Sequence, residues 1–316
     1  MSIPLRVGLI GARRTHEGTG PYVARFLEDA GARVVAVAGT SAASAAEAAG
    51  DLETTLGHPL AAAPSVAALL EGDLHAIAIC SPTPTHLELV EAGAARGLHV
   101  LCEKPVGWTE DGPDVDRLAR AEAALRARGR VLAANAQWPW TLEDFEALEP
   151  GLCRAAVRSF AMRVAPSSPG LAGLCESLPH PASLLAALGC DGEIGDLEVW
   201  NARDGSHVKL SFEAFREGGP PVEVRLEFEV EARQPRTAWY ALDGVRMTRT
   251  VSLDPYAIGF GVGDRRRQAV DPMQRCVAAF VARCGRIGGA TEGSILPAER
   301  LAAAAWRGAL AGWGQW

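Results

Sequence analysis

The chain has 316 residues, of which 48% are hydrophobic and 22% charged, and its formal net charge is −7. This length allows two domains with substantial cores, and the composition is typical of a globular protein. The negative charge argues against a nucleic-acid partner, because a polyanion is bound by a broad positive surface. No stretch of the sequence is long and apolar enough to span a bilayer, so we expect no membrane partner.

Cysteine and histidine usage narrows the class further. The seven cysteines are scattered and include no pair with CxxC spacing, and the histidines show no metal-ligand spacing. The odd number argues against a disulfide framework, and the spacings argue against a metal site. Because the sequence also lacks a secretory signal pattern, we expect a reducing, cytoplasmic location.

The first third of the chain alternates short apolar runs with amphipathic stretches. We predict strands over residues 5–10, 33–38, 76–80, 99–102 and 131–134, with helices over 21–30, 44–49, 65–71, 85–96 and 114–128 between them. This β-α repetition is typical of a doubly wound parallel sheet with right-handed crossovers. We therefore predict an α/β domain over residues 1–135.

The pattern changes after residue 135. Residues 222–231 alternate apolar and charged side chains without a break, which indicates an antiparallel strand with one buried face. Residues 239–251 contain Asp243-Gly244, a strong hairpin signal, and helices are predicted at 272–283 and 297–310. Residues 136–316 are therefore predicted to form an α+β domain with a largely antiparallel sheet.

The loop after the first strand contains a spaced set of glycines. A dinucleotide-binding turn places Gly-x-Gly-x-x-Gly here, so that the backbone approaches the pyrophosphate at a helix N-terminus. Gly11 is in the expected place, Arg13 stands at the second glycine position, and the later glycines follow an apparent insertion. An ordinary connecting loop is the alternative, but the strand–loop–helix order favours a cofactor site. The candidate residues are Gly11, Ala12, Arg13, Arg14, Gly18 and Gly20.

The end of the second strand distinguishes the two nicotinamide cofactors. An acidic residue there binds the ribose 2′-hydroxyl of NAD, whereas a nearby arginine favours the 2′-phosphate of NADP. This chain has Thr40 and Ser41 without an acid, while Arg13 and Arg14 lie in the first loop. The pattern favours NADP over NAD, although the two arginines also fit a solvated basic turn.

Two further segments follow buried strands. Ser81 and Pro82 begin a loop that leads to His86, which is either part of a nicotinamide pocket or an ordinary histidine at a helix start. Glu103-Lys104-Pro105 ends the run from Leu98. A lysine at the carboxyl end of a buried strand lies where open α/β sheets bind ligands.

Together, Cys80-Ser81-Pro82-x-x-x-His86 and Gly97-Leu98-His99-Val100-Leu101-Cys102-Glu103-Lys104-Pro105 resemble the Gfo/Idh/MocA oxidoreductase family. The resemblance implies a Rossmann domain followed by an α+β domain with an open-faced sheet. It also implies hydride transfer between NAD(P) and a secondary alcohol or carbonyl of a sugar or cyclitol-like small molecule. Members of the family are commonly homodimers or homotetramers assembled through the C-terminal sheet.

A second family signature, Asp-x-Gly-x-His-x-x-Asp, is matched in part by residues 176–183. The resemblance assigns proton transfer to His180, support by Glu176, and stabilisation of the reacting oxygen to Lys104. Because Pro181 suits a first helical position, we expect His180 to cap a helix and to be neutral at rest. A structural role for His180 and a solvated role for Glu176 remain open.

Residues at the domain junction complete the candidate site. Gln137, Trp138 and Trp140 border the substrate in the family pattern, and the two indoles suit either a substrate wall or a buried core. The family often has an arginine near Gln137, and its absence here weakens the case for an anionic substrate. The altered signatures leave two alternatives: a dinucleotide-binding sensor with little catalysis, and a reductase of an imine or non-sugar ketone.

Overall fold

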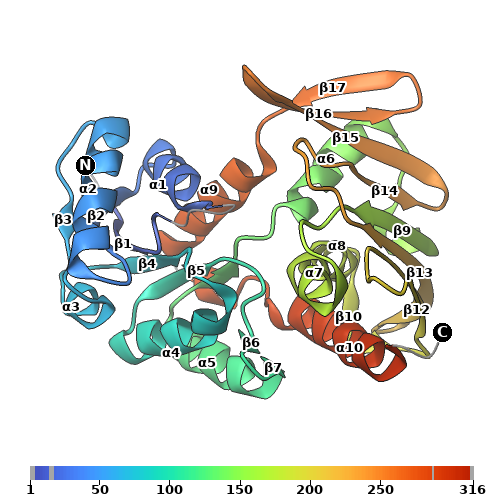
Figure 1. Ribbon diagram of the computed structural model, residues 1–316, viewed down its shortest axis with the longest axis horizontal. Helices are drawn as coiled ribbons and strands as arrows, with labels where there is room; N and C mark the ends of the chain where they lie inside the picture. Colours follow the sequence, from blue (N-terminus) through green and yellow to red (C-terminus); the bar gives the residue numbers. More distant parts are fainter. Residues whose placement is uncertain (1–3, 14–17, 287, 314–316) are drawn as a thin grey trace. The chain divides into compact units, whose positions relative to one another are not determined.

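The computed structural model describes residues 4–13, 18–286 and 288–313. The chain divides into two compact units (Figure 1). The first contains residues 1–135 and 273–295, and the second contains residues 136–272 and 296–316. None of the helices in the described residues is long and apolar enough to cross a membrane.

The first unit is built on a parallel sheet with the strand order β3-β2-β1-β4-β5-β8. This is the order of a doubly wound dinucleotide-binding domain, as the β-α repetition predicts. The strands are β1 (Arg6–Ile10), β2 (Arg33–Ala38), β3 (Ala61–Ala62), β4 (Ala76–Ile79), β5 (His99–Cys102) and β8 (Leu132–Ala134). Their pairings are all parallel, and β4 and β5 are buried along their whole length.

Helices lie on both faces of this sheet, with α1 and α9 on one side and α4 and α5 on the other (Figure 1). Their bounds are α1 (Gly20–Asp29), α2 (Ala42–Leu56), α3 (Val66–Leu70), α4 (His86–Arg96), α5 (Val115–Ala127) and α9 (Pro272–Cys284). Short elements complete the unit: η1 (Thr83–Thr85), β6 (Trp108–Thr109), β7 (Gly112–Pro113) and η4 (Gly289–Thr291). The predicted helix over 44–49 is longer in the structure because Ser41 caps it at one end and Gly57 ends it at the other.

The return of residues 273–295 to the first unit differs from the single division predicted at residue 135. Val277 and Phe280 of α9 are fully buried in the same apolar cluster as Val7, Leu27 and Val34. These side chains need a core partner, and the face of the parallel sheet beside α1 supplies it. A linear reading of hydrophobic periodicity predicts the helix but not the sheet on which it packs.

The second unit contains a sheet with the order β10-β12-β13-β9-β14-β15-β16-β17, and β11 pairs with β12. The β13–β9 pairing is parallel and the others are antiparallel. The strands are β9 (Ser159–Val164), β10 (Cys190–Ile194), β11 (Glu198–Asn201), β12 (His207–Arg216), β13 (Gly219–Glu229), β14 (Ala238–Leu242), β15 (Val245–Leu253), β16 (Tyr256–Val262) and β17 (Arg265–Ala269).

One face of this sheet is covered by helices and the other is open. The helices are η2 (Trp138–Thr141), α6 (Leu142–Leu148), η3 (Arg154–Ala156), α7 (Gly170–Ser177), α8 (Pro179–Ala187) and α10 (Leu296–Gly312). The predicted alternation along β13 is confirmed, since Val222, Val224, Leu226 and Phe228 are buried. The predicted hairpin at Asp243-Gly244 is also confirmed: both residues have positive φ, and Leu242 pairs with Val245 across a two-residue turn.

Candidate functional site

The loops that follow four strands of the parallel sheet lie along one edge. The amide N–H of Gly11 donates to Ala38 O, and that of Cys80 donates to Ile10 O. The amide of Glu103 donates to Ile79 O, and that of Asn135 donates to Cys102 O. These backbone bonds align the carboxyl ends of β1, β4, β5 and β8, the edge at which such sheets bind ligands.

Two glycines in the first loop allow a close approach of backbone segments. Gly11 has a φ of +83°, and a Cβ there would lie 2.6 Å from the Ser81 amide nitrogen. Gly20 begins α1, and a Cβ there would lie 2.8 Å from Ala12 Cα. The first position needs a left-handed backbone, and the second brings the loop against the helix start, as a pyrophosphate-binding turn requires. The described parts of the loop, residues 11–13 and 18–20, therefore fit a dinucleotide although the glycines are spaced apart.

The residues predicted to bind the adenosine end of the cofactor differ in their exposure and in their partners. Thr40 and Ser41 are exposed, and Ser41 caps α2 by accepting a hydrogen bond from the Ser44 amide. Arg13 pairs with Glu47, and its Nε lies 3.3 Å from Asp51 Oδ2, so two acids of α2 surround this guanidinium. Gly18 is half-buried, and Arg14 lies outside the described residues.

His86 connects two of the loops. Its ring is fully buried, with Nε2 2.8 Å from Ser81 O and Nδ1 2.7 Å from Pro105 O. Ser81 is also buried and its hydroxyl bonds to Thr85 Oγ1, whereas Pro82 is exposed. Thr85 does not cap α4 as its position suggests, because its hydroxyl donates to Pro82 O instead. The histidine thus joins the loop after β4 to the loop that carries Lys104.

Glu103 and Lys104 follow β5 directly. Glu103 is buried, and one of its oxygens accepts a 2.5 Å hydrogen bond from Asn135 Nδ2. The Asn135 Oδ1 atom is buried and has no hydrogen-bond partner in the described residues, so it is available to a donor from a ligand. Lys104 is half-buried, and the Lys104–Pro105 peptide bond is cis.

In the second unit, His180 lies inside the first turn of α8. The expectation that Pro181 begins the helix with His180 at its cap is wrong, because Pro179 already occupies the first helical position. Proline suits that position since the N–H it lacks would be unpaired there. His180 is half-buried, and Glu176 lies in the preceding helix α7, where it accepts a 3.4 Å hydrogen bond from the Ser167 hydroxyl.

An aromatic cluster that includes Trp138 lies beside His180. Trp138 of η2 is buried, and its ring makes edge contacts with His180 at 6.2 Å and with Tyr240 at 6.1 Å. The Thr141 hydroxyl donates to Trp138 O, so the Tyr240 hydroxyl, 3.0 Å away, donates to Thr141. Burial raises the pKa of Tyr240 well above its usual range, which keeps this donor protonated. Gln137 and Trp140 flank Trp138 and are half-buried.

Arg249 carries no recognisable motif in the sequence and was not predicted as a functional residue. Its guanidinium lies over the Trp138 ring, 5.3 Å from the centroid, on the covered face of the sheet. A signal was present, since Val245, Met247 and Val251 occupy the alternate inward positions of β15 and Arg249 interrupts them with a charge. Asn135 was not predicted as a site residue either, because nothing in the sequence indicates its hydrogen bond with Glu103.

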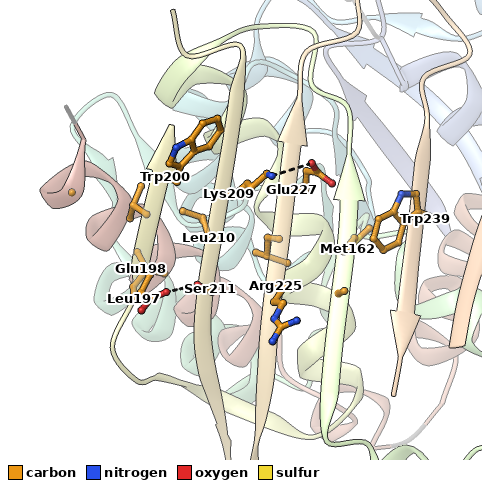
Figure 2. A pocket seen from close by; sticks show the side chains of 14 residues that line it. Met162, Leu197, Glu198, Trp200, Lys209, Leu210, Ser211, Arg225, Glu227 and Trp239 are labelled. Atoms are coloured by element: carbon orange, nitrogen blue, oxygen red, sulfur yellow. Dashed lines mark hydrogen bonds and ion pairs between the residues drawn. The ribbon is translucent and has the colours of Figure 1, made fainter. Parts of the chain in front are cut away.

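The open face of the second sheet carries a depression with a volume of about 850 Å³. Figure 2 shows Trp200 and Trp239 at its two sides, with Lys209 and Glu227 between them. Lys209 lies over the Trp200 ring at 5.5 Å, and Trp200 is 45% exposed. This surface combines aromatic rings with paired charges.

Sequence comparisons identify relatives of the first part of the chain. Residues 5–135 match the Gfo/Idh/MocA model, described as an oxidoreductase family with an NAD-binding Rossmann fold. An inositol 2-dehydrogenase of Streptomyces avermitilis is 43% identical over 104 residues, which are 33% of this chain and 27% of that protein. The rhizopine catabolism protein MocA of Rhizobium meliloti is 35% identical over 136 residues, 42% of this chain and 37% of that protein. The matches thus span 27% and 37% of the length of these two relatives.

Solved structures extend the likeness in fold to both units. A UDP-N-acetylglucosamine 3-dehydrogenase, GnnA from Acidithiobacillus ferrooxidans, superposes with a TM-score of 0.68 at 20% identity and covers 97% of each chain. The 3-ketoreductase KijD10 from Actinomadura kijaniata, solved with NADP and TDP-benzene, gives a TM-score of 0.66 at 22% identity over 97% of each chain. At these identities the similarity establishes the shared two-domain fold.

Proposed function

We propose that this chain, whose residues 5–135 belong to the Gfo/Idh/MocA oxidoreductase family, is an NAD(P)-dependent dehydrogenase or reductase. Its substrate is a small molecule with a secondary alcohol or carbonyl, of the sugar or cyclitol type. The observation that carries this proposal is the position of Lys104, directly after β5 at the ligand-binding edge of the parallel sheet. The bound nicotinamide supplies or accepts the hydride.

Lys104 stabilises negative charge on the reacting oxygen. An ammonium group beside an alkoxide lowers the barrier in both directions, because it also polarises the carbonyl for reduction. The Lys104 loop is held by His86, whose Nδ1 faces Pro105 O, and by Glu103, whose carboxylate accepts from Asn135. These contacts reduce the freedom of the loop, which keeps the lysine oriented before the reaction.

His180 takes the hydroxyl proton during oxidation and returns it during reduction. Histidine suits both directions because its ordinary pKa is close to neutrality. The edge contact with Trp138 fixes one side of the ring. Glu176, four residues before His180 in the chain, assists as a carboxylate. Gln137, Trp138 and Trp140 form the wall against which the substrate ring rests.

NADP is the preferred cofactor in this proposal. The end of β2 has Thr40 and Ser41 in place of an acid, and both lie at the positive end of α2. Arg13 is close to the same helix, although it pairs there with Glu47 and Asp51. The remaining contacts come from the first loop, the loop after β4 and the segment after β5: Gly11, Ala12, Gly18, Gly20, Ser81, Pro82, His86, Glu103 and Lys104, together with Arg14, which lies outside the described residues.

The open face of the second sheet is the proposed contact between identical subunits in a homodimer or homotetramer. Its exposed Trp200 and its paired charges provide the apolar and polar parts of an interface. Replacing Trp200 with glutamate is expected to dissociate the assembly in light scattering, and a monomeric wild-type chain would contradict the proposal. A reducing compartment such as the cytoplasm fits the seven cysteines, all within the described residues and none in a disulfide.

One experiment separates this function from its alternatives. NADPH and NADH are titrated by fluorescence, and panels of polyols, sugars, ketones and imines are then screened with wild type and Lys104→Ala. We expect NADPH to bind more tightly, turnover of a polyol or sugar, and a fall in kcat of about 100-fold or more in the variant. Cofactor binding without turnover would instead indicate a sensor, and turnover of imines or non-sugar ketones alone would indicate the other alternative. Failure of both cofactors to bind would contradict all of these functions.

A further inference from the structure

Arg249 is a largely buried cation that alternates with apolar residues along its strand. It occupies an inward position of β15, between Met247 and Val251, on the face covered by helices. Burial lowers the pKa of its guanidinium from the ordinary value, because the charged form loses water. A buried charge is normally paired with an opposite charge, since an isolated one costs several kcal/mol.

The described residues give Arg249 no such partner. Its Nε is buried without a hydrogen bond, and its Nη2 makes one long bond of 3.4 Å to Arg236 O. The Asp271 carboxylate favours the charged form from a distance, but it accepts a 2.9 Å hydrogen bond from the Tyr256 hydroxyl and forms no described ion pair with Arg249. Most of the donors of the guanidinium are therefore left for another acceptor.

The position of Arg249 connects it to the candidate catalytic histidine. One indole, that of Trp138, carries the guanidinium 5.3 Å from its ring centroid and meets the His180 ring at 6.2 Å. The Trp138 ring lies against the guanidinium, and this cation–π contact restricts the side chain before a ligand arrives. A planar guanidinium with unused donors is the preferred protein group for binding a carboxylate or phosphate in a bidentate manner.

We propose that Arg249 binds an oxyanion, a carboxylate or a phosphate, carried by the substrate whose alcohol or carbonyl reacts at His180. The inference rests on the proposed function, and it narrows the substrate class from neutral polyols to acidic or phosphorylated ones. The arginine that the family often has near Gln137 is absent from this chain, and Arg249 supplies the positive charge instead. Arg249 lies on a strand more than 100 residues further along the chain.

The test compares ligand binding in wild type, Arg249→Met and Arg246→Met. Arg246 is a matched control, because it also lies on β15 and over an indole, that of Trp239 at 3.8 Å, but it is exposed on the opposite face. D-Glucuronate, D-glucose 6-phosphate and neutral D-glucose are titrated calorimetrically into each NADPH-loaded protein. The first two probes distinguish a carboxylate from a phosphate.

We expect at least one of the two acidic probes to bind wild type at least about tenfold more tightly than D-glucose. Arg249→Met is expected to lose this preference, while Arg246→Met keeps it. Arg249→Lys retains the charge without the planar fork, so an intermediate preference is expected, and this variant serves if the methionine variant does not fold.

Other results would overturn the inference. A wild type that binds D-glucose as well as both acidic probes, or that binds none of the three, would contradict it. If Arg249→Met weakened the binding of all three probes equally, the role of the arginine would be only to hold Trp138 in place. Because the measurement requires no turnover, wild type can fail it while NADPH binding and turnover of neutral polyols, measured separately, still support the proposed function.

Discussion

The carboxyl edge of the parallel sheet and the covered face of the antiparallel sheet position their side chains differently. At the edge, Gly11, Ser81 and Lys104 come within two residues of a buried strand, so main-chain hydrogen bonds determine where they lie. On the covered face, Trp138, His180 and Arg249 come from a 3-10 helix, an α-helix and a strand that are far apart in sequence. They meet only through side-chain packing. Substitutions at the edge should therefore act through the backbone, and those on the covered face through ring contacts.

The largest effect is expected from Gly11→Ala. Its Cβ would lie 2.6 Å from the Ser81 amide nitrogen, which is backbone and cannot move aside, so NADPH binding and activity should be lost. Gly31→Ala is the matched control, since Gly31 has a similar φ of +86° with no atom near the added Cβ. It should cost about 1 kcal/mol of stability and leave cofactor binding intact. Equal loss of binding in both variants would mean that backbone strain, not crowding of the loop, is responsible.

The next effect concerns the covered face. His180→Asn should lower kcat/KM by about 100-fold or more, because the general acid and base is removed, while NADPH affinity stays unchanged. His207→Asn provides a control on the open face of the same sheet, where His207 pairs with Glu227 at 2.9 Å. Steady-state kinetics on the substrate found in the panel measures the difference. An unchanged kcat/KM in His180→Asn would remove this residue from the mechanism.

A His86 variant tests whether cofactor binding at the carboxyl edge of the parallel sheet depends on a side chain as well as on the backbone. Both ring nitrogens lie within hydrogen-bond distance of carbonyl oxygens, so the ring donates to at least one of them. His86→Phe fills the space without a donor and leaves a carbonyl of Ser81 or Pro105 without this hydrogen bond, at a cost of about 1–3 kcal/mol. We expect a lower melting temperature and about tenfold weaker NADPH binding. A destabilised variant with unchanged NADPH affinity would limit His86 to a role in folding.

His99, at the opposite end of β5 from Lys104, is expected to make the stability of the protein depend on pH, independently of the candidate site. Burial, together with the charge of Arg130, lowers the pKa of His99 to about 4. The unfolded chain takes up this proton below about pH 6.5 and the folded chain does not, so stability falls by up to about 1.4 kcal/mol per unit between about pH 6.5 and 4. Urea denaturation at about pH 7 and 5 measures this loss. The same loss in His99→Gln would assign the pH dependence to other groups.

The smallest effect concerns Arg13. Glu47→Gln removes one of the two acids that pair with this guanidinium, so Arg13 becomes more available to a 2′-phosphate. We expect NADPH affinity to rise a few-fold and NADH affinity to stay the same, because exposed ion pairs are weak. Glu71→Gln, which breaks the exposed pair with Arg96, is the control. A parallel change in both cofactors would show that Arg13 does not recognise the phosphate.

The fold followed from local patterns to a large extent. The predicted β2 and β5 have the observed bounds, because buried parallel strands appear in sequence as short β-branched or apolar runs between turn residues. The alternation along β13 and the Asp243-Gly244 turn could also be predicted from the sequence. The packing of α9 on the first unit could not, since periodicity identifies an apolar helix face but not the surface that buries it. The bonds of His86 and Glu103 were equally hidden, because their partners are carbonyl and amide groups of distant segments.

Local sequence patterns alone predict the element order, the glycine-containing loop, the position of Lys104 after its strand, and the family to which these residues point. Such features depend on backbone conformation and on burial over a few neighbouring residues, and both are encoded locally. Only the tertiary structure revealed that Arg249 shares one indole with His180, and that Asn135 holds the Glu103 carboxylate. These contacts join residues far apart in the chain, and the free energy that selects them comes from packing and desolvation in the folded protein.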